Sequence, residues 1–259
     1  MWIVILGVIN LILLIIGLKF FFPKDFWTEK NVKLLLIIQK NLLPIIIISV
    51  VVIVHMLEVN IIDPIVTKWV GYDYANVIQG FEGNTVYWFS QHWTPVLLYF
   101  FVIMYIAVYP FTLWFAPTYF LVTDQKKALK TLAYGLLLIY LIALPFYLFI
   151  PITNVYTFYG VNSSLETVLP SIEGFFYSTT TNNNCLPSLH TAMTILVAYS
   201  VSFTGNKKFT YFAYFCMICV IISVIYLSIH WITDVITGSI LAIGAIFILR
   251  KFMRVDENR

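Results

Sequence analysis

Long apolar segments, separated by shorter polar connections, make up most of the chain. Seven of these segments approach the roughly 20 apolar residues that a helix needs to cross a bilayer. The pattern predicts an all-α, polytopic transmembrane helical bundle of about seven spans, without the broken, inversely repeated helices typical of transporters. The expected spans are approximately Trp2–Leu18, Leu34–Leu57, Thr94–Val122, Thr131–Ile150, Ser188–Phe203, Thr210–Ile229 and Ile232–Leu249.

The composition agrees with a membrane-embedded fold and argues against several other classes. Of the 259 residues, 61% are hydrophobic and 10% are charged, whereas soluble domains carry about 25% charged residues. No basic stripe alternates with aromatic residues, so we expect no nucleic-acid partner. The three cysteines form no disulfide framework. The first segment lacks a basic n-region and a cleavage site, which favours a retained anchor helix over a removed signal peptide.

Basic residues are distributed asymmetrically along the chain. Every Lys and Arg except Lys68 lies in or beside the connections between the first and second, third and fourth, and fifth and sixth segments, or follows the seventh. Alternate connections share one side of a membrane, and cytoplasmic loops carry the excess of Lys and Arg. The sequence therefore predicts an integral cell-membrane protein with its N-terminus outside and its C-terminus in the cytoplasm.

All four histidines fall on the outer side in this topology. His190 begins the fifth segment and His230 ends the sixth, so a helical hairpin should return these two side chains, 40 positions apart, to one pocket. Asp234 follows His230 by four residues, which would place it one helical turn further along the same face. His55 and His92 lie at membrane boundaries, where an amphipathic ring more often serves as an interfacial anchor.

The tetrapeptide Pro187-Ser188-Leu189-His190 is typical of a helix N-terminus. Proline is favoured in the first turn, and the free N–H groups of that turn can hold an anion. Ser188 adds a hydroxyl donor and His190 a transferable proton. This segment therefore predicts a phosphate site with a general acid beside it, although a serine that only caps the helix would look the same.

A further motif, His230-x-x-x-Asp234, places an ionisable residue within an apolar segment. Such a residue costs roughly 2.5–3.5 kcal/mol on insertion scales, which makes Asp234 a functional candidate. A carboxylate bonded to one imidazole nitrogen leaves the other nitrogen free to attack. We therefore expect His230 to be a nucleophile that passes through a phosphohistidine. Gly238 would let a neighbouring helix pack closely.

Pro-Ser-Leu-His followed by His-Trp-Ile-Thr-Asp-Val-Ile-Thr-Gly resembles the second and third motifs of the type-2 phosphatidic acid phosphatase superfamily, over roughly Lys126–Leu249. The resemblance implies a six-helix catalytic core and metal-independent phosphoester chemistry without a cofactor. It implies that His230 is the nucleophile, Asp234 its partner, His190 the acid and Ser188 a phosphate ligand. The leucine within Pro-Ser-Leu-His is more similar to the inositol phosphotransferase branch, which makes inositol phosphorylceramide, than to the branch with glycine there.

The chain departs from that family in its cations. Where the third motif often has Ser-Arg, this chain has Ser223 and Val224, and no arginine precedes Arg250. The family's first motif is not recognisable, and the cation-free segment 151–156 stands near its position. Phosphate oxygens would thus lack the usual guanidinium clamps. Helix N–H groups and a few polar side chains would have to replace them: Ser188, Asn183, Asn184 and Lys68.

These observations predict an integral-membrane lipid phosphate or pyrophosphate phosphatase at the outer face, with a lipid phosphate substrate and the bilayer as its partners. We divide the chain into an N-terminal anchor helix with its connection (1–33), a transmembrane catalytic core (34–250, with the motifs within 126–249) and a cytoplasmic tail (251–259). Three alternatives stay open. The protein could transfer a phospho-headgroup between lipids, bind lipid without catalysis, or hold a metal or transport substrate with the four histidines and Asp234 or Glu58.

Overall fold

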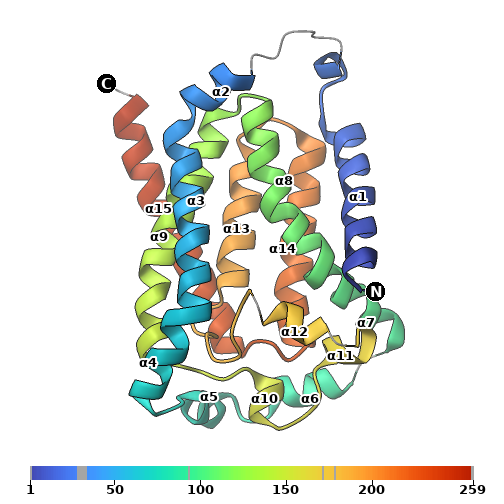
Figure 1. The fold of residues 1–259 in the computed structure, drawn as a ribbon, viewed down its shortest axis with the longest axis vertical. Coiled ribbons are helices and arrows are strands. Elements are labelled where there is room, and N and C mark those ends of the chain that lie inside the picture. The colour runs from blue at the N-terminus through green and yellow to red at the C-terminus, as the bar shows by residue number, and fades with distance from the viewer. Residues whose placement is uncertain (1, 28–33, 93, 171, 178, 258–259) are drawn as a thin grey trace.

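The computed structural model describes residues 2–27, 34–92, 94–170, 172–177 and 179–257. It confirms the all-α bundle: in Figure 1 the long helices stand side by side, and short helices cover one end of them. The described residues contain no β-strand, only one isolated bridge between Ile152 and Asn184. The short helices that cover the end are α5 Ala75–Glu82, α6 Thr85–Gln91, α10 Val155–Phe158, α11 Ser164–Val168 and α12 Ile172–Phe176.

Among the described residues, six helical stretches are long and apolar enough to cross a membrane. Two of them are composite, because π-helical segments join shorter α-helices end to end. The stretch Leu42–Val70 runs through α3 (Leu42–Leu57), η2 (Glu58–Ile62) and α4 (Asp63–Val70), and Pro95–Val122 runs through α7 (Pro95–Ile103), η3 (Met104–Val108) and α8 (Tyr109–Val122). The other long helices are α1 Trp2–Phe21, α9 Lys126–Phe149, α14 Lys207–Tyr226 and α15 Ile232–Glu257.

The second span differs from the expected Leu34–Leu57. Leu34–Lys40 forms a separate helix, α2, and the break falls at Asn41. The Asn41 side chain donates to the carbonyl oxygen of Ile37 at 2.9 Å. Pro44 has no N–H to donate to the carbonyl oxygen of Lys40, so the regular backbone ladder is interrupted here. The membrane-crossing stretch therefore starts later and extends to Val70.

The seventh expected span is α13 (Leu189–Ser202), which is shorter than the others. Its 14 residues correspond to about 21 Å, less than the roughly 30 Å of a bilayer hydrocarbon core. α13 packs against α8, α9, α14 and α15 and lies inside the bundle in Figure 1. Because its neighbours surround it, α13 need not match the bilayer thickness. Its first residues therefore lie recessed within the bundle.

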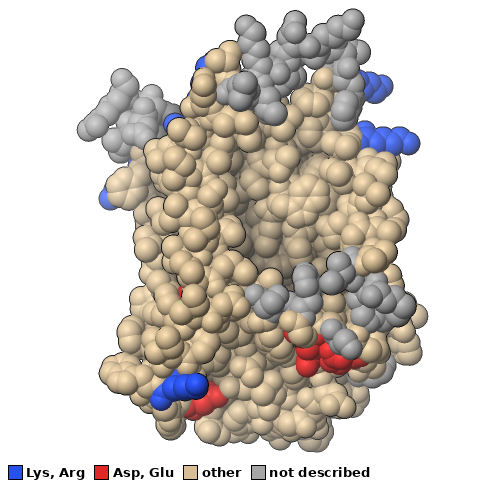
Figure 2. All heavy atoms as spheres, viewed as in Figure 1, with Lys and Arg blue, Asp and Glu red and all other residues tan. Residues whose placement is uncertain are grey.

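The connections that carry the basic residues lie at one end of the bundle. In Figure 1 the end of α1, the start of α2 and the end of α15 lie at the upper end, together with the links from α8 to α9 and from α13 to α14. Lysine and arginine atoms gather at that end in Figure 2, apart from one group near the opposite end, where acidic atoms are visible. Lys30, Lys33 and Arg259 lie outside the described residues.

Candidate active site

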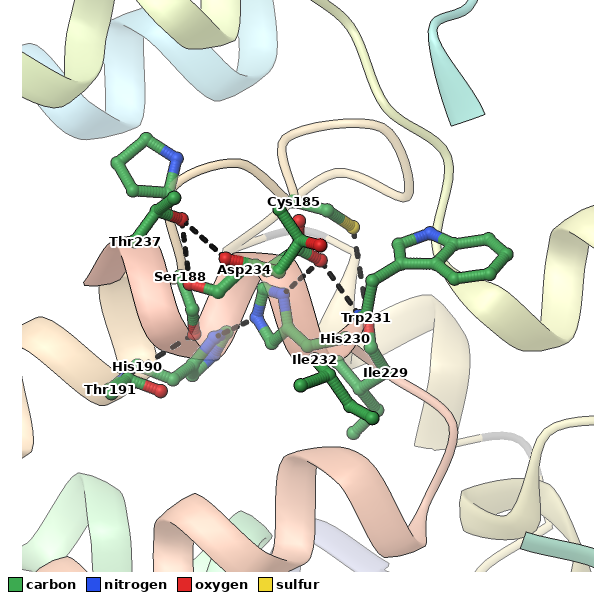
Figure 3. Close-up of polar contacts among 12 residues, drawn as sticks. Cys185, Ser188, His190, Thr191, Ile229, His230, Trp231, Ile232, Asp234 and Thr237 are labelled. Carbon is green, nitrogen blue, oxygen red and sulfur yellow. Dashed lines mark hydrogen bonds and ion pairs between the residues drawn. The ribbon is translucent and has the colours of Figure 1, made fainter. Parts of the chain in front are cut away.

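Two histidines far apart in the chain meet at the recessed start of α13. Nδ1 of His190 lies 3.0 Å from Nε2 of His230, and Figure 3 shows the two rings facing each other. His190 is in the first turn of α13. α14 ends at Tyr226, and the N–H groups of Ile229 and His230 close that end by donating to the carbonyl oxygen of Val224 at 2.9 and 3.0 Å. His230 thus lies in the turn between α14 and α15, and not at the end of a helix as expected.

The His230–Asp234 contact is therefore not made along one helix face. Asp234 stands in the first turn of α15, and its side chain reaches back to the preceding turn. Its Oδ2 lies 3.2 Å from Nδ1 of His230 and accepts the backbone N–H of Trp231 at 2.8 Å. His230 is 2% exposed and Asp234 is 0% exposed. The backbone bond fixes the carboxylate in the position from which it orients the imidazole.

The hydrogen bonds at these residues determine which nitrogen of each histidine donates a proton and which accepts one. When Asp234 is ionised its oxygens only accept, so Nδ1 of His230 then carries a proton and Nε2 has a free electron pair. His190 must then donate from Nδ1 to that pair, which leaves its own Nε2 as an acceptor. The hydroxyl of Tyr105, from η3, lies 2.9 Å from this nitrogen and is its donor. Hydrogen bonds thus connect Tyr105, His190, His230 and Asp234 in series, and this arrangement needs no charge on either imidazole.

Burial favours the neutral form of His230. Removal from water lowers the pKa of His230 to about 3, because a buried imidazolium loses its hydration. The same effect raises the pKa of the neighbouring Cys185 thiol. At neutral pH the site therefore holds an uncharged histidine with a nucleophilic nitrogen, beside a protonated thiol.

Close packing holds the start of α13 against α15. The backbone N–H of Ser188 donates to the carbonyl oxygen of Asp234 at 2.9 Å. A Cβ on Gly238 would collide with the backbone of Ser188, so only glycine allows this approach. Ser188 is buried, and its hydroxyl oxygen accepts the N–H of Thr191 at 3.3 Å as a helix cap. Contact with a phosphate would compete with this cap.

A cavity of about 350 Å³ reaches the first histidine. His190, Tyr105, Asn184 and His55 are among its polar lining, while most of its wall is apolar. The lining comes from α3, η2, η3, α8, α9 and α13, and from Phe176, Thr179, Thr180 and Asn184. Figure 2 shows a hollow in the face between α3 and α8. This shape is typical of a site for an amphiphile, with a polar end at His190 and an apolar path.

Two other predicted ligands lie elsewhere. Lys68 and Asn183 line a separate, open pocket of about 690 Å³ together with Asp63 and Asp73. The amide of Asn183 donates to the hydroxyl of Thr67 at 2.9 Å. The structure thus brings together His190, His230 and Asp234, and Asn184 lines the same cavity as His190. It places Lys68 and Asn183 around a different opening.

Sequence reasoning missed residues that support the pair. Glu82 of α5 accepts the backbone N–H groups of Ile232 and Thr233 at 2.9 and 2.5 Å, and so caps the start of α15. Tyr105 carries no local signal, since it is one of many aromatics in an apolar segment. Glu58 was named from the sequence, but only as part of a possible metal or transport site. The segment 151–156 lies against the same turn, where the indole of Trp231 donates to the carbonyl oxygen of Thr153 at 2.9 Å.

One group among the described residues has the geometry to hold a metal ion. It consists of Cys185, His230 and Asp234, whose ligand atoms lie within 4.8 Å of one another. A metal there would replace the His230–Asp234 hydrogen bond and the proton of the Cys185 thiol. The four histidines do not form such a group among the described residues. His92 is exposed, and its Nδ1 bonds the carbonyl oxygen of Trp88 at 2.7 Å.

Comparison with known proteins agrees with this site. A family model described as the PAP2 superfamily matches residues 79–248, a stretch that holds both histidines and Asp234. No curated protein matches the chain, and no solved structure matches it. The family match covers more than half of the chain. The chain therefore belongs to the PAP2 superfamily, whose members are phosphatases or phosphotransferases, and it is an integral-membrane enzyme of that phosphatase type.

Proposed function

We propose that the protein cleaves a lipid phosphate or pyrophosphate through a phosphohistidine on His230, at the extracytoplasmic face. The observation that carries this proposal is the directed chain of hydrogen bonds through His190 and His230 to Asp234. It supplies a neutral nucleophilic nitrogen, a proton donor beside it and a carboxylate that stabilises the developing cation. These are the parts that nucleophilic catalysis with general acid help requires.

The reaction would proceed in two steps. A phosphate entering from the cavity separates the two histidines, and Nε2 of His230 attacks phosphorus. The bond from phosphorus to the leaving oxygen breaks. That oxygen takes the Nδ1 proton of His190, which has first bound a second proton from water at Nε2 and so returns to a neutral imidazole. Water or an alcohol then attacks the phosphohistidine and gives its proton to His190, while the P–N bond returns its electrons to His230. Asp234 stays ionised throughout, as the orienting acid of a catalytic triad does.

Local charge supports a particular substrate class. Lys68 is the one lysine or arginine predicted for the outer side, and it lines a pocket other than that of His190. Glu58 and Asp234 are buried nearby at the same end of the bundle. Acidic neighbours and missing guanidinium groups disfavour a dianionic monoester. We therefore favour phosphodiester or pyrophosphate-linked lipids, which include the inositol-phosphate-type headgroups suggested by the motif resemblance.

The test is a panel of purified variants assayed with phosphate-labelled lipids. His230→Ala should remove both labelled enzyme and product, and Asp234→Asn should slow turnover by about 10² to 10⁴-fold because the imidazole loses its orienting acid. The acid-labile label on the wild type should map to His230. His92→Gln is the matched control, since that exposed ring lies outside the pocket, and it should act within twofold of wild type.

Three outcomes would contradict the proposal. Wild-type rates in His190→Ala, His230→Ala and Asp234→Asn together would show that the site is not catalytic. Activity lost with a chelator and restored by zinc would move the chemistry to a metal on Cys185, His230 and Asp234. Retained lipid binding, with no turnover of monoesters, diesters or pyrophosphates, would favour the non-catalytic reading that the missing arginines also allow.

A further inference from the structure

A second histidine–carboxylate pair, His55 and Glu58, adjoins through His55 the cavity that His190 lines. Glu58 is 0% exposed and stands in the π-helical segment η2, within a membrane-crossing stretch. Buried acids in such stretches mark functional sites by default. His55, one turn earlier, lines the cavity with His190. The reaction proposed above uses neither residue.

The surroundings of Glu58 fix most of its hydrogen bonds. The amide of Asn184 donates to Oε1 at 2.7 Å. Oε2 lies 3.5 Å from Nδ1 of His55, which is longer than a good hydrogen bond. Nε2 of His55 lies 3.2 Å from the carbonyl oxygen of Thr179 and must donate to it, because a carbonyl only accepts. Nδ1 of neutral His55 is therefore left with a free electron pair.

Three buried atoms of this group lack a hydrogen-bond partner among the described residues. They are Nδ1 of His55, Oε2 of Glu58 and Oδ1 of Asn184. In the arrangement above, all three are acceptors. Buried polar atoms are nearly always satisfied, and those without a protein partner point to a ligand or water. The hydroxyl of Tyr140, which also lacks a partner within hydrogen-bond distance in the described part of the chain, lies beside Glu58 and can supply one donor. The other two acceptors still need a group that donates protons.

The cavity indicates what carries that donor. His55, Asn184 and His190 share its polar end, and its apolar wall includes Val52, Met56, Leu113 and Met193. Val52 and Met56 are also partly exposed on the outer surface of α3, where lipid tails would lie. A ligand that fits both ends has a hydroxyl group and a hydrocarbon chain.

We propose that the group formed by Glu58, His55 and Asn184 is the acceptor subsite for a hydroxyl-bearing lipid, which makes the enzyme a phosphotransferase. This inference rests on the proposed phosphohistidine. The lipid hydroxyl donates to the Glu58–His55 pair and faces phosphorus on His230. Its oxygen attacks, the new P–O bond forms and the P–N bond breaks. The electrons return to His230. For this acceptor the Glu58–His55 pair replaces His190 as the base that takes the hydroxyl proton, and His190 recovers its own proton from water.

The first experiment measures binding, independently of catalysis. Wild-type protein in lipid nanodiscs is titrated with 1,2-dioctanoylglycerol and with 1,2-propanediol dioctanoate, which lacks only the hydroxyl. We expect the hydroxyl ligand to bind at least about fivefold tighter, and Glu58→Gln to remove the difference. Asp63→Asn is the matched control, since that buried acid accepts from Thr67 at 3.1 Å and lines the other pocket. Equal binding of both ligands to the wild type would overturn the proposal.

The second experiment measures how the phosphoenzyme is partitioned. With labelled donor lipid and dioctanoylglycerol, Glu58→Gln should lower the ratio of transfer to hydrolysis by about tenfold. Phosphohistidine formation should stay within twofold of wild type. His55→Gln changes a partly exposed side chain and should also lower the ratio of transfer to hydrolysis. It replaces Glu58→Gln as the test if that variant does not fold.

The outcomes separate the two proposals. Equal losses of transfer and hydrolysis, or an unchanged ratio, would overturn the acceptor subsite. So would occupation of the pocket by a cation, seen as sodium-dependent binding that Glu58→Gln abolishes. Absence of phosphohistidine in the wild type would overturn the proposed function, and the binding comparison alone would then decide the subsite.

Discussion

The two histidine–carboxylate pairs of this protein use similar residues in opposite ways. His230 and Asp234 lie 3.2 Å apart, are almost fully buried, and are fixed by the backbone of Trp231. His55 and Glu58 lie 3.5 Å apart, with the histidine side chain 28% exposed. The first pair has a second imidazole as its partner, whereas the second pair faces a cavity. The neighbours of a pair, more than its own residue types, decide what it can do.

The difference is also one of rigidity. The first pair is held by a turn, the Glu82 cap of α15 and the contact between Gly238 and Ser188. A nucleophile needs this support, because small displacements from the reacting geometry are costly. The second pair sits in a π-helical segment, and such segments often occur at functional sites. Its unpartnered acceptors suit a subsite that a ligand completes.

Among changes at residues outside the reacting pair, the largest effect should come from pushing α15 away from the start of α13. Gly238→Ala places a methyl group against the Ser188 backbone, which cannot yield as a side chain can. We expect phosphohistidine formation to fall by about 10- to 100-fold. Gly244→Ala on the same helix is the control, since a Cβ there meets no atom within 4 Å. Equal activity of both variants would show that this close packing does not position the pair.

An intermediate effect should come from Tyr105, which contacts His190 and also lines the cavity that His55 shares. Tyr105→Phe removes one neutral hydrogen bond, so turnover should fall by about five- to tenfold. Tyr109→Phe is the control, because the Tyr109 ring also packs on His190 while its hydroxyl contacts the sulfur of Met193 at 3.9 Å. A loss that appears only in transfer, and not in hydrolysis, would assign Tyr105 to the second pair.

The smallest effect concerns stability and pH. Burial lowers the pKa of His230 from 6.5 to about 3, so the unfolded chain binds a proton that the folded protein does not. The stabilisation is complete above about pH 6.5 and declines as the pH falls toward 3. We expect the melting temperature of the wild type to fall from pH 7 to pH 4.5, and to fall less in His230→Gln. His92→Gln should keep the wild-type slope, and a matching slope in His230→Gln would contradict the assignment.

Much of the fold was predictable because it depends on local patterns. The apolar segments mark six membrane-crossing stretches among the described residues and the shorter α13. The segment break at Asn41 was missed, although Pro44, which has no N–H for the carbonyl oxygen of Lys40, is a local signal for it. The turn at His230 was also missed, because the apolar run continues past the point where the helix ends.

The sequence by itself determined that His190, His230 and Asp234 converge, because a hairpin of two apolar helices must bring its ends together. Only the tertiary structure decided what surrounds them. Asn184 meets Glu58 across 126 positions, and Tyr105 meets His190 across 85. Lys68 and Asn183 line another opening. Spacing within a helix or a hairpin fixes near neighbours, whereas contacts between distant segments depend on how helices of different length and curvature pack.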